Sequence, residues 1–356
     1  MCGIVGFVGA RADMQEILQG MMDAIAHRGP DGQGQFIEGP AALGQRRLSI
    51  IDLEGGKQPM FNEDGSLVCI FNGEIYNFQT LREELIAAGH TFATRSDTEV
   101  LLHGYEQWGV DLLQRVRGMF TFVIWDKNKQ ELFGARDHFG IKPFYYAKMN
   151  GTFMYASEIK SLLRHPDFVK ELNAEALKPY MTFQYPAIGE TFFKGVYKLP
   201  EGHYFTYRDG KMDIHRYYDE DFREGKQKLG ELVNSIDQTV CDSVKAPQIA
   251  DVEVGSFLSS GVDSSYVAAV ARPQHTYSIG FGKGTYNESQ QAGELAELLK
   301  LNNTAESLTD EEAFAAFPRI QWHLDEPDSN PSCVPLYFLS AIQSVMMTFI
   351  CGAVGY

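Results

Sequence analysis

The sequence predicts an α/β protein in two parts, a layered domain of antiparallel sheets followed by a doubly wound parallel sheet. Three observations lead to this prediction: the length of the chain, the strand-like runs up to about residue 205, and the alternation of strands and helices after about residue 228. A chain of 356 residues exceeds what one small core usually organises, so we expect two domains.

Short apolar runs separated by turn signals fill the first part. Examples are GIVGFVG, SLVCIFNG and TFMYASE, and runs of this kind are typical of strands. The stretch FVIWDKNKQELFGA places a polar turn between two such runs, which predicts an antiparallel hairpin. Helices are expected over residues 14–25, where apolar residues recur near helical spacing, and over 80–88.

The pattern changes after this first part. Residues 206–227 are polar, charged and weakly periodic, so we expect a connector there between domains 1–205 and 228–356. Beyond it, helices and strands alternate, which favours a parallel sheet. The expected helices are 228–243, 264–271, 288–301, 311–322 and 335–344, and the expected strands are 252–258 and 275–281.

Composition narrows the class of protein. A net charge of −16 argues against a broad nucleic-acid-binding surface, because such surfaces are usually basic. Five cysteines without CxxC spacing indicate reduced thiols rather than disulfides or a zinc site. The start lacks the cationic and continuous apolar regions of a signal peptide, and the apolar tail, 344–356, falls short of the ~20 residues that span a bilayer. We therefore expect a cytoplasmic protein with no membrane partner.

The chain opens MCGIVGF, with a cysteine directly after the start methionine. Removal of Met1 would leave Cys2 as the N-terminal residue, beside its own α-amine with a reference pKa of about 7.7–8.0. An N-terminal amine that activates its own side chain is a known catalytic arrangement. The alternative is a buried cysteine at the start of a strand, and for these two letters alone that alternative is favoured.

Other motifs favour a catalytic Cys2 over a buried structural cysteine. The stretches FNGEIYN, RRLSIID and RSDTEVL each have a plain structural explanation, namely a turn, an exposed strand and a helix N-terminus. Together with HRGPDGQG, GARDHFGIKPFYY and SEIKSLL, in this order and spacing, the first 205 residues resemble the class II glutamine amidotransferases, the N-terminal-nucleophile glutaminases. The resemblance implies a sandwich of layered antiparallel sheets with helices.

It also implies a role for each matching residue. Cys2 attacks the side-chain amide of glutamine, while Asn72 and the N–H of Gly73 form the oxyanion hole. Arg47 grips the α-carboxylate, as a planar fork suits this better than an ammonium group, and Glu74 and Asp97 contact the α-ammonium group. The expected glutamine-binding residues are Arg47, Leu48, Ser49, Ile50, Ile51, Asn72, Gly73, Glu74 and Asp97.

The second part contains GSFLSSGVDSS between a strand and a helix. Small residues there expose backbone N–H groups and a positive helix end to phosphates, although Ser/Gly turns before helices are also common. The stretch resembles the pyrophosphate loop of ATP pyrophosphatases, SGGxDS, with Ser260 where that family often has glycine. The resemblance implies ATP-binding residues Leu258, Ser259, Ser260, Gly261, Asp263, Ser264 and Ile279, with Asp263 as a Mg²⁺ ligand.

A class II glutaminase followed by this loop is similar to the glutamine-hydrolysing asparagine synthetases. That resemblance implies that ATP activates aspartate as β-aspartyl-AMP and that ammonia from glutamine displaces AMP. Members of the family often pair, so a homodimer is possible. The acidic stretch 324–340 fits either a lining of the second site or a solvated loop.

The resemblance ends at the tail. The family continues with an acidic loop, SGEGxDE, whereas this chain reads VMMTFICGAVGY, so we expect an incomplete synthetase domain. The alternatives are a stand-alone glutaminase fragment and a non-catalytic remnant or partner protein. Amidotransferases that aminate phosphoribosyl pyrophosphate, fructose phosphate or 2-oxoglutarate lack an SSGVDSS-type loop, and β-lactam synthetases lack a working glutaminase.

Overall fold

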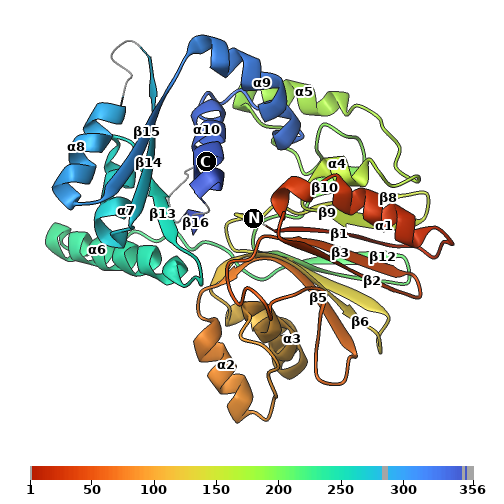
Figure 1. Ribbon diagram of the computed structural model, residues 1–356. Coiled ribbons are helices and arrows are strands. Elements are labelled where there is room, and N and C mark those ends of the chain that lie inside the picture. Colours follow the sequence, from red (N-terminus) through yellow and green to blue (C-terminus); the bar gives the residue numbers. More distant parts are fainter. Residues whose placement is uncertain (1, 283–287, 347–348, 351–356) are drawn as a thin grey trace. The chain divides into compact units, whose positions relative to one another are not determined.

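The computed structural model describes residues 2–282, 288–346 and 349–350. The chain divides into two compact units, Met1–Asp221 and Phe222–Tyr356 (Figure 1). The predicted fold class is confirmed, because the first unit is built on antiparallel sheets and the second on a parallel sheet. None of the helices described is both long and apolar enough to cross a membrane.

Two antiparallel sheets form the centre of the first unit. The first has the strand order β10-β8-β9-β1-β3-β2 and the second β12-β11-β7-β6-β5-β4. The strands of the first sheet are β1 (Gly3–Val8), β2 (Gly32–Glu38), β3 (Ala41–Arg47), β8 (Tyr145–Met149), β9 (Thr152–Ala156) and β10 (Val196–Lys198). Those of the second are β4 (Met60–Phe61), β5 (Leu67–Ile75), β6 (Gly118–Asp126), β7 (Glu131–Arg136), β11 (His203–Arg208) and β12 (Lys211–Arg216).

Helices cover the outer face of each sheet and give the first unit four layers (Figure 1). The α-helices of this unit are α1 (Met14–Asp23), α2 (Phe78–Ala87), α3 (Asp97–Trp108), α4 (Ile159–Leu162) and α5 (Leu177–Phe183). Short 3₁₀ turns are η1 (Ala26–Arg28), η2 (Gly109–Gln114) and η3 (Ala174–Ala176). Helices α1 and α4 lie on the sheet that contains β1, and α2 and α3 lie on the side of β5.

The spacing of apolar residues explains how these layers pack. Helix α1 buries Ile17, Leu18 and Met21 on one face, the i, i+1, i+4 pattern of a helix that lies on a sheet. A second apolar cluster, with Trp125 and Tyr155 among its buried members, fills the space between the two sheets. The predicted hairpin is confirmed as β6 and β7, paired antiparallel.

Part of the stretch expected as a connector, 206–227, forms strands although its sequence is polar. Residues up to Arg216 complete β11 and form β12, which pair antiparallel at the edge of the second sheet. A polar sequence suits this position, because one face of an edge hairpin meets water. The first compact unit therefore extends to Asp221.

The second unit contains a parallel sheet with the strand order β15-β14-β13-β16. Its strands are β13 (Val254–Phe257), β14 (His275–Phe281), β15 (Asn302–Leu308) and β16 (Phe349–Ile350). Its helices are α6 (Leu229–Lys245), η4 (Ala246–Gln248), α7 (Val262–Ala271), α8 (Ser289–Leu299), α9 (Asp310–Leu324) and α10 (Cys333–Met346). Helices α8 and α10 lie on either side of this sheet (Figure 1). The tail CGAVGY, where we expected the acidic loop to be missing, lies outside the described residues.

Candidate active site

Cys2 lies immediately before β1, which pairs antiparallel with β3 so that Gly3 faces Arg46. Its Sγ is 3.4 Å from both the N and the O of Leu48, the residue that follows β3. Burial raises the pKa of the Cys2 thiol above its ordinary value, while the hydrogen bond from the Leu48 N–H opposes this increase. The sulfur therefore sits in a fixed position at the end of two paired strands.

The backbone of Cys2 is held by a second group of residues. Arg28 Nε donates to the carbonyl oxygen of Cys2 at 2.9 Å, and Arg28 Nη1 lies 2.8 Å from Glu158 Oε1. Glu158 also accepts from Lys160 and lies 3.0 Å from His27 Nε2. Burial alone would raise the pKa of Glu158, but hydrogen bonds from His27 and Arg28 and the charge of Lys160 hold it well below its usual range.

Nearly all the expected glutaminase residues line one pocket. The expected residues that line it are Cys2, Arg47, Leu48, Ile50, Ile51, Asn72, Gly73, Glu74 and Asp97. Ser49 is the exception, since its N–H donates to Asp31 Oδ2 at 2.8 Å and the residue is not part of the lining.

Arg47 supplies a buried positive charge to this pocket. Only 8% of its surface is exposed, and its guanidinium donates to the backbone oxygens of Leu53, Ile51 and Asp52 at 2.8, 3.2 and 2.7 Å. In the part of the chain that the structure describes, no carboxylate forms an ion pair with it. A buried guanidinium without an anion is well suited to bind a substrate carboxylate.

The open edge of β5 supplies hydrogen-bond donors. The N–H groups of Phe71 and Ile75 point to this edge, where Gln58 Oε1 accepts the first at 2.7 Å and Asp97 Oδ2 the second at 3.0 Å. Strand alternation places the N–H of Gly73 on the same edge, between these two. The side-chain Nδ2 of Asn72 is buried and has no hydrogen-bond acceptor among the described residues.

Glycine is required at position 73. A Cβ atom there would clash with the carbonyl oxygen of Met119 on β6. Because the two strands approach each other so closely, residue 73 cannot carry a side chain. The Gly73 backbone therefore lines this part of the pocket.

Two carboxylates and one ammonium group complete the pocket. Burial raises the pKa of Asp97 to about 6, and it raises the pKa of Glu74 above its ordinary value. Lys142 lines the same pocket, and burial lowers its pKa while the charge of Glu74 opposes this decrease. A cation that enters the pocket would therefore stabilise the ionised form of both carboxyl groups.

Sequence reasoning missed several residues of this site. Lys142 stands inside the quoted stretch GARDHFGIKPFYY, and Glu158 inside SEIKSLL, so the motifs contained them without indicating a role. Gln58 lies outside the quoted motifs, and its contact with Phe71 is visible only in the folded chain.

The SSGVDSS loop lies between β13 and α7 in the second unit. Ser264 Oγ is 2.8 Å from Ser259 Oγ and accepts from the N–H of Ser259 at 3.2 Å. Gly261 caps α7 with an extended backbone, and its N–H donates to Ser259 Oγ at 3.1 Å. Ser260 does not adopt positive φ, so serine fits where glycine was anticipated.

The remaining expected nucleotide-binding residues surround this loop. Leu258 follows β13 and is buried, and Ile279 lies on the neighbouring strand β14. Because the strands are parallel, both residues approach the same, carboxyl end of the sheet. Asp263 is exposed in the first turn of α7.

Comparison with known families agrees with this geometry. Residues 1–218 match the family model described as a glutamine amidotransferase domain, and residues 235–347 match the model described as asparagine synthase. The first match covers more than half of the chain. The chain therefore belongs to the glutamine amidotransferase family.

Known proteins narrow the family further. Glutamine-hydrolyzing asparagine synthetase 1 of Bacillus subtilis (strain 168) is 42% identical over 350 residues, which cover 96% of this chain and 55% of that protein. Putative glutamine-hydrolyzing asparagine synthetase 2 of Methanocaldococcus jannaschii is 31% identical, over 100% of this chain and 74% of that protein. The chain belongs to the family of glutamine-hydrolysing asparagine synthetases, as its motifs predicted. It spans about half the length of the first curated relatives it matches.

Two solved structures also match at low sequence identity. The glutamine phosphoribosylpyrophosphate amidotransferase from B. subtilis, complexed with ADP and GMP, is 18% identical with a TM-score of 0.46, over 85% of this chain and 65% of that chain. A structure described as the allosteric regulatory enzyme of purine biosynthesis is 15% identical with a TM-score of 0.48, over 86% of this chain and 80% of that chain.

Proposed function

We propose that the first unit hydrolyses glutamine with Cys2 as the nucleophile once Met1 is removed. The observation that carries this proposal is the pocket itself, whose lining includes the Cys2 thiol, the buried Arg47 guanidinium and Asn72, whose Nδ2 has no acceptor among the described residues. Glutamine carries an amide at one end and a carboxylate and an ammonium group at the other. The pocket offers a complementary group for each of them.

In this proposal, binding precedes chemistry. Arg47 binds the α-carboxylate of glutamine through the fork of its guanidinium, and Asp97 and Glu74 receive the α-ammonium group. Burial disfavours the charged forms of these carboxylates. The positive charge of the bound α-ammonium group offsets this effect and stabilises their ionised forms. Leu48, Ile50 and Ile51 line the pocket beside Arg47.

The chemical steps then follow from the same contacts. The α-amine of Cys2 takes the proton of the thiol, and the sulfur attacks the amide carbon. Asn72 Nδ2 and the Gly73 N–H stabilise the developing oxyanion. The carbon–nitrogen bond breaks, ammonia leaves with the proton that the amine held, and water hydrolyses the thioester to glutamate and free thiol.

We propose that the second unit directs this ammonia into asparagine synthesis. The loop Ser259–Ser264 would hold the pyrophosphate part of ATP at the N-terminus of α7, with Leu258 and Ile279 against the nucleoside. Aspartate attacks the α-phosphate of ATP, giving β-aspartyl-AMP and pyrophosphate. Ammonia then displaces AMP and leaves asparagine, so the substrates of the full reaction are glutamine, aspartate and ATP.

Asp263 is the residue we assign to Mg²⁺. Magnesium is usually bound by one or two carboxylates together with substrate phosphates, and an exposed carboxylate in the first turn of α7 fits this requirement. When bound, the ion would neutralise phosphate charge.

A cytoplasmic location and a homodimer complete the proposal. The described cysteines all carry free thiols, which suits a reducing compartment. Pairing is inferred from the family resemblance, and light scattering of the purified protein would test it.

Three assays on the full chain test the proposed function. The mass of the N-terminal peptide reports removal of Met1, mass spectrometry of protein mixed with glutamine reports the γ-glutamyl thioester, and glutamate release reports turnover. Cys2→Ala should keep the folded circular-dichroism spectrum and lose both the adduct and turnover. Turnover close to wild type in Cys2→Ala would exclude Cys2 as the nucleophile.

The assay for the second unit is ATP–pyrophosphate exchange with aspartate. Exchange together with asparagine formation supports the full synthetase. A stand-alone glutaminase is the second candidate function, favoured by the presence of all the pocket residues within the first compact unit. It predicts glutamate release without exchange, whereas a non-catalytic remnant predicts neither.

A further inference from the structure

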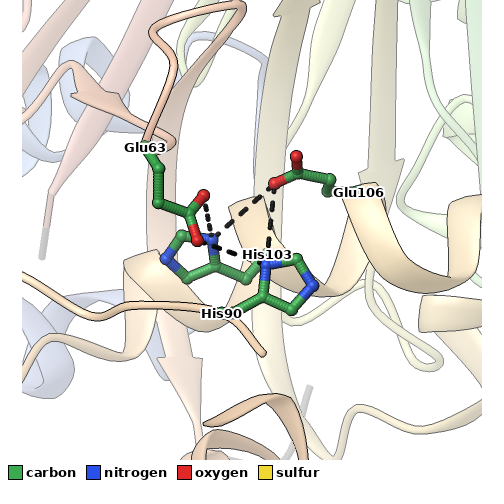
Figure 2. Close-up of side chains that lie close together, drawn as sticks. All are labelled: Glu63, His90, His103 and Glu106. Carbon is green, nitrogen blue, oxygen red and sulfur yellow. Dashed lines mark hydrogen bonds and ion pairs between the residues drawn. The ribbon is translucent and has the colours of Figure 1, made fainter. Parts of the chain in front are cut away.

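Four side chains outside the glutaminase pocket converge in the first unit: Glu63, His90, His103 and Glu106 (Figure 2). Glu63 lies in the turn between β4 and β5, and His90 follows the end of α2. His103 and Glu106 lie three residues apart on α3 and therefore share one face of that helix. One ligand atom from each of the four residues lies within 4.8 Å of the others.

The two imidazole rings turn the same nitrogen atom toward the carboxylates. His103 Nδ1 is 3.1 Å from Glu63 Oε2, and His90 Nδ1 is 3.3 Å from Glu63 Oε1. Glu106 Oε2 lies 3.8 Å from His90 Nδ1 and 3.9 Å from His103 Nδ1. Figure 2 shows these four side chains pointing toward one another.

The opposite nitrogen of each ring faces a different acceptor. His90 Nε2 is 3.1 Å from Gln107 Oε1, and His103 Nε2 is 3.5 Å from Glu99 Oε1. The Glu99 carboxylate is itself fixed by the N–H groups of Ala93 and Thr94 at 2.6 and 2.8 Å. When each neutral imidazole carries its proton on Nε2, the side on which these acceptors lie, its Nδ1 lone pair is directed at Glu63 and Glu106.

In this tautomer the arrangement brings together only electron-pair donors. Two Nδ1 lone pairs and two carboxylates face one another, and His103 is 1% exposed, so bulk water does not reach it. Neither ring nitrogen of His103 has a partner with hydrogen-bond geometry among the described residues. A buried polar group without a partner is destabilising, so a cation between the four groups would remove this energetic cost.

The separations match a tetrahedral metal centre. Zinc lies about 2.0–2.1 Å from histidine nitrogen and about 2.0–2.2 Å from carboxylate oxygen, so its ligand atoms are about 3.3–3.5 Å apart. The four separations given above, measured to both oxygens of Glu63, are 3.1–3.9 Å, and one ligand atom from each residue lies within 4.8 Å of the others, so an ion would draw the four groups slightly closer together. Nitrogen ligands from imidazole favour a transition metal over Mg²⁺ or Ca²⁺, which prefer oxygen alone.

Surrounding groups orient the ligands. The N–H of Thr91 donates to Glu63 Oε1 at 3.0 Å, and Asn62 Nδ2 lies 3.4 Å from Glu106 Oε2. Metal-binding histidines usually have their second nitrogen paired with a carboxylate or another acceptor in this way. The contacts of Gln107 and Glu99 with the two Nε2 atoms fit that pattern.

We propose that Glu63, His90, His103 and Glu106 bind one divalent transition-metal ion of the Zn²⁺ class. The ion joins the β4–β5 turn and the segment after α2 to α3. The first residues of α3, Asp97 and Thr98, line the glutaminase pocket, so the site is a structural clamp on the helix that carries part of the pocket. This inference does not depend on the proposed function.

The test uses the full chain, treated with a chelator and then titrated with ZnCl₂ by calorimetry. His90→Gln/Glu106→Gln removes two ligands, and His215→Gln/Glu131→Gln removes the same residue types elsewhere in the first unit. All proteins carry Cys2→Ala, because a thiolate beside an α-amine is itself a zinc ligand set. Circular dichroism confirms folding, and a parallel titration with CoCl₂ reports tetrahedral coordination through its visible bands.

The protein that keeps all four ligands and the control variant His215→Gln/Glu131→Gln should each bind one equivalent of Zn²⁺ and show a higher Tm with metal. The His90→Gln/Glu106→Gln variant should bind at least about 10-fold more weakly and lose the Tm increase, as expected when metal ligands are removed. Equal affinity in the two variants would overturn the proposal. So would an absence of Zn²⁺ binding in the folded protein with all four ligands, which would instead indicate protonated histidines paired with carboxylates.

Discussion

Arg28 Nε donates a hydrogen bond to the carbonyl oxygen of Cys2, with the two atoms 2.9 Å apart. The same guanidinium is paired with Glu158, which is 130 positions further along the chain. The position of Cys2, the residue before the first strand, therefore depends on a partly buried ion pair with the SEIKSLL segment. Arg28 is a positioning residue for Cys2, since its contact is with the backbone rather than the sulfur.

Arg28→Lys should lower kcat for glutamine hydrolysis and leave KM close to wild type. A lysine cannot reproduce both contacts of the guanidinium fork, and a displacement of about 1 Å at a reacting group costs about 10²-fold in rate. Steady-state kinetics measure the effect. Arg46→Lys is the matched control, because Arg46 contacts the carbonyl oxygen of Met22 and not Cys2; an equal loss of kcat in both variants would contradict the positioning role.

Asn72→Ala should lower kcat for glutamine hydrolysis by about 10²–10³-fold, the usual cost of removing one oxyanion-hole donor. The same change should leave Tm unchanged or higher, because it removes a buried Nδ2 donor that has no acceptor in the described part of the chain. Kinetics and thermal unfolding together separate the two effects. Asn128→Ala, in the β6–β7 turn, should change neither quantity, and a drop in Tm for Asn72→Ala would show that its side chain has a structural partner.

Strong local patterns made the fold predictable from the sequence. The strand expected over 275–281 is β14, His275–Phe281, because an apolar run between two turns has few other solutions. The strand β15 was not expected, since Asn302–Leu308 contains mostly polar residues. It lies at the edge of the sheet, where water reaches the strand and the apolar signal is weak.

The residues of the site that lie in sequence motifs were predictable. Those that come together only through long-range packing were not. The stretches around Arg47, Asn72 and Asp97 could be matched along the chain, and the structure brings them to one pocket. The contact between Gln58 and Phe71 joins a loop to a strand edge, and the Glu63–His90–His103–Glu106 cluster joins three segments at irregular spacing. Contacts of this kind depend on the packing of α3 against the second sheet, which no local spacing records.

Asp97 should make the stability of the first unit depend on pH. Burial raises its pKa from 3.8 to about 6, so the folded state holds a proton that the unfolded state releases between these values. Stability from this group is therefore present below about pH 3.8 and is lost as the pH rises to about 6. At higher pH the buried charge costs at most about 3 kcal/mol, taking about 1.4 kcal/mol for each unit of pKa.

Asp97→Asn removes this titration. Thermal unfolding at a series of pH values should give the variant and the wild type similar Tm values near pH 4, with the variant gaining relative to the wild type as the pH rises to 7. Asp31→Asn is the control for an exposed carboxylate. A Tm difference that is constant across this pH range would show that Asp97 does not titrate there.

Ser264→Ala should weaken ATP binding, because its hydroxyl organises the Ser259–Ser264 loop that we propose binds the phosphates, rather than merely facing solvent. Its Oγ contacts both Oγ and N of Ser259, and Ser259 Oγ in turn accepts from the N–H of Gly261. Loss of one such hydrogen bond costs about 0.5–1.5 kcal/mol, or up to about 10-fold in Kd for ATP measured by calorimetry in the presence of Mg²⁺.

Ser260→Gly should stay within about threefold of wild type, because the backbone of Ser260 does not occupy the positive-φ region that would favour glycine. If Ser260→Gly weakens ATP binding as much as Ser264→Ala, the side chain of Ser260 contacts the nucleotide and the loop is not held by the Ser259–Ser264 pair alone.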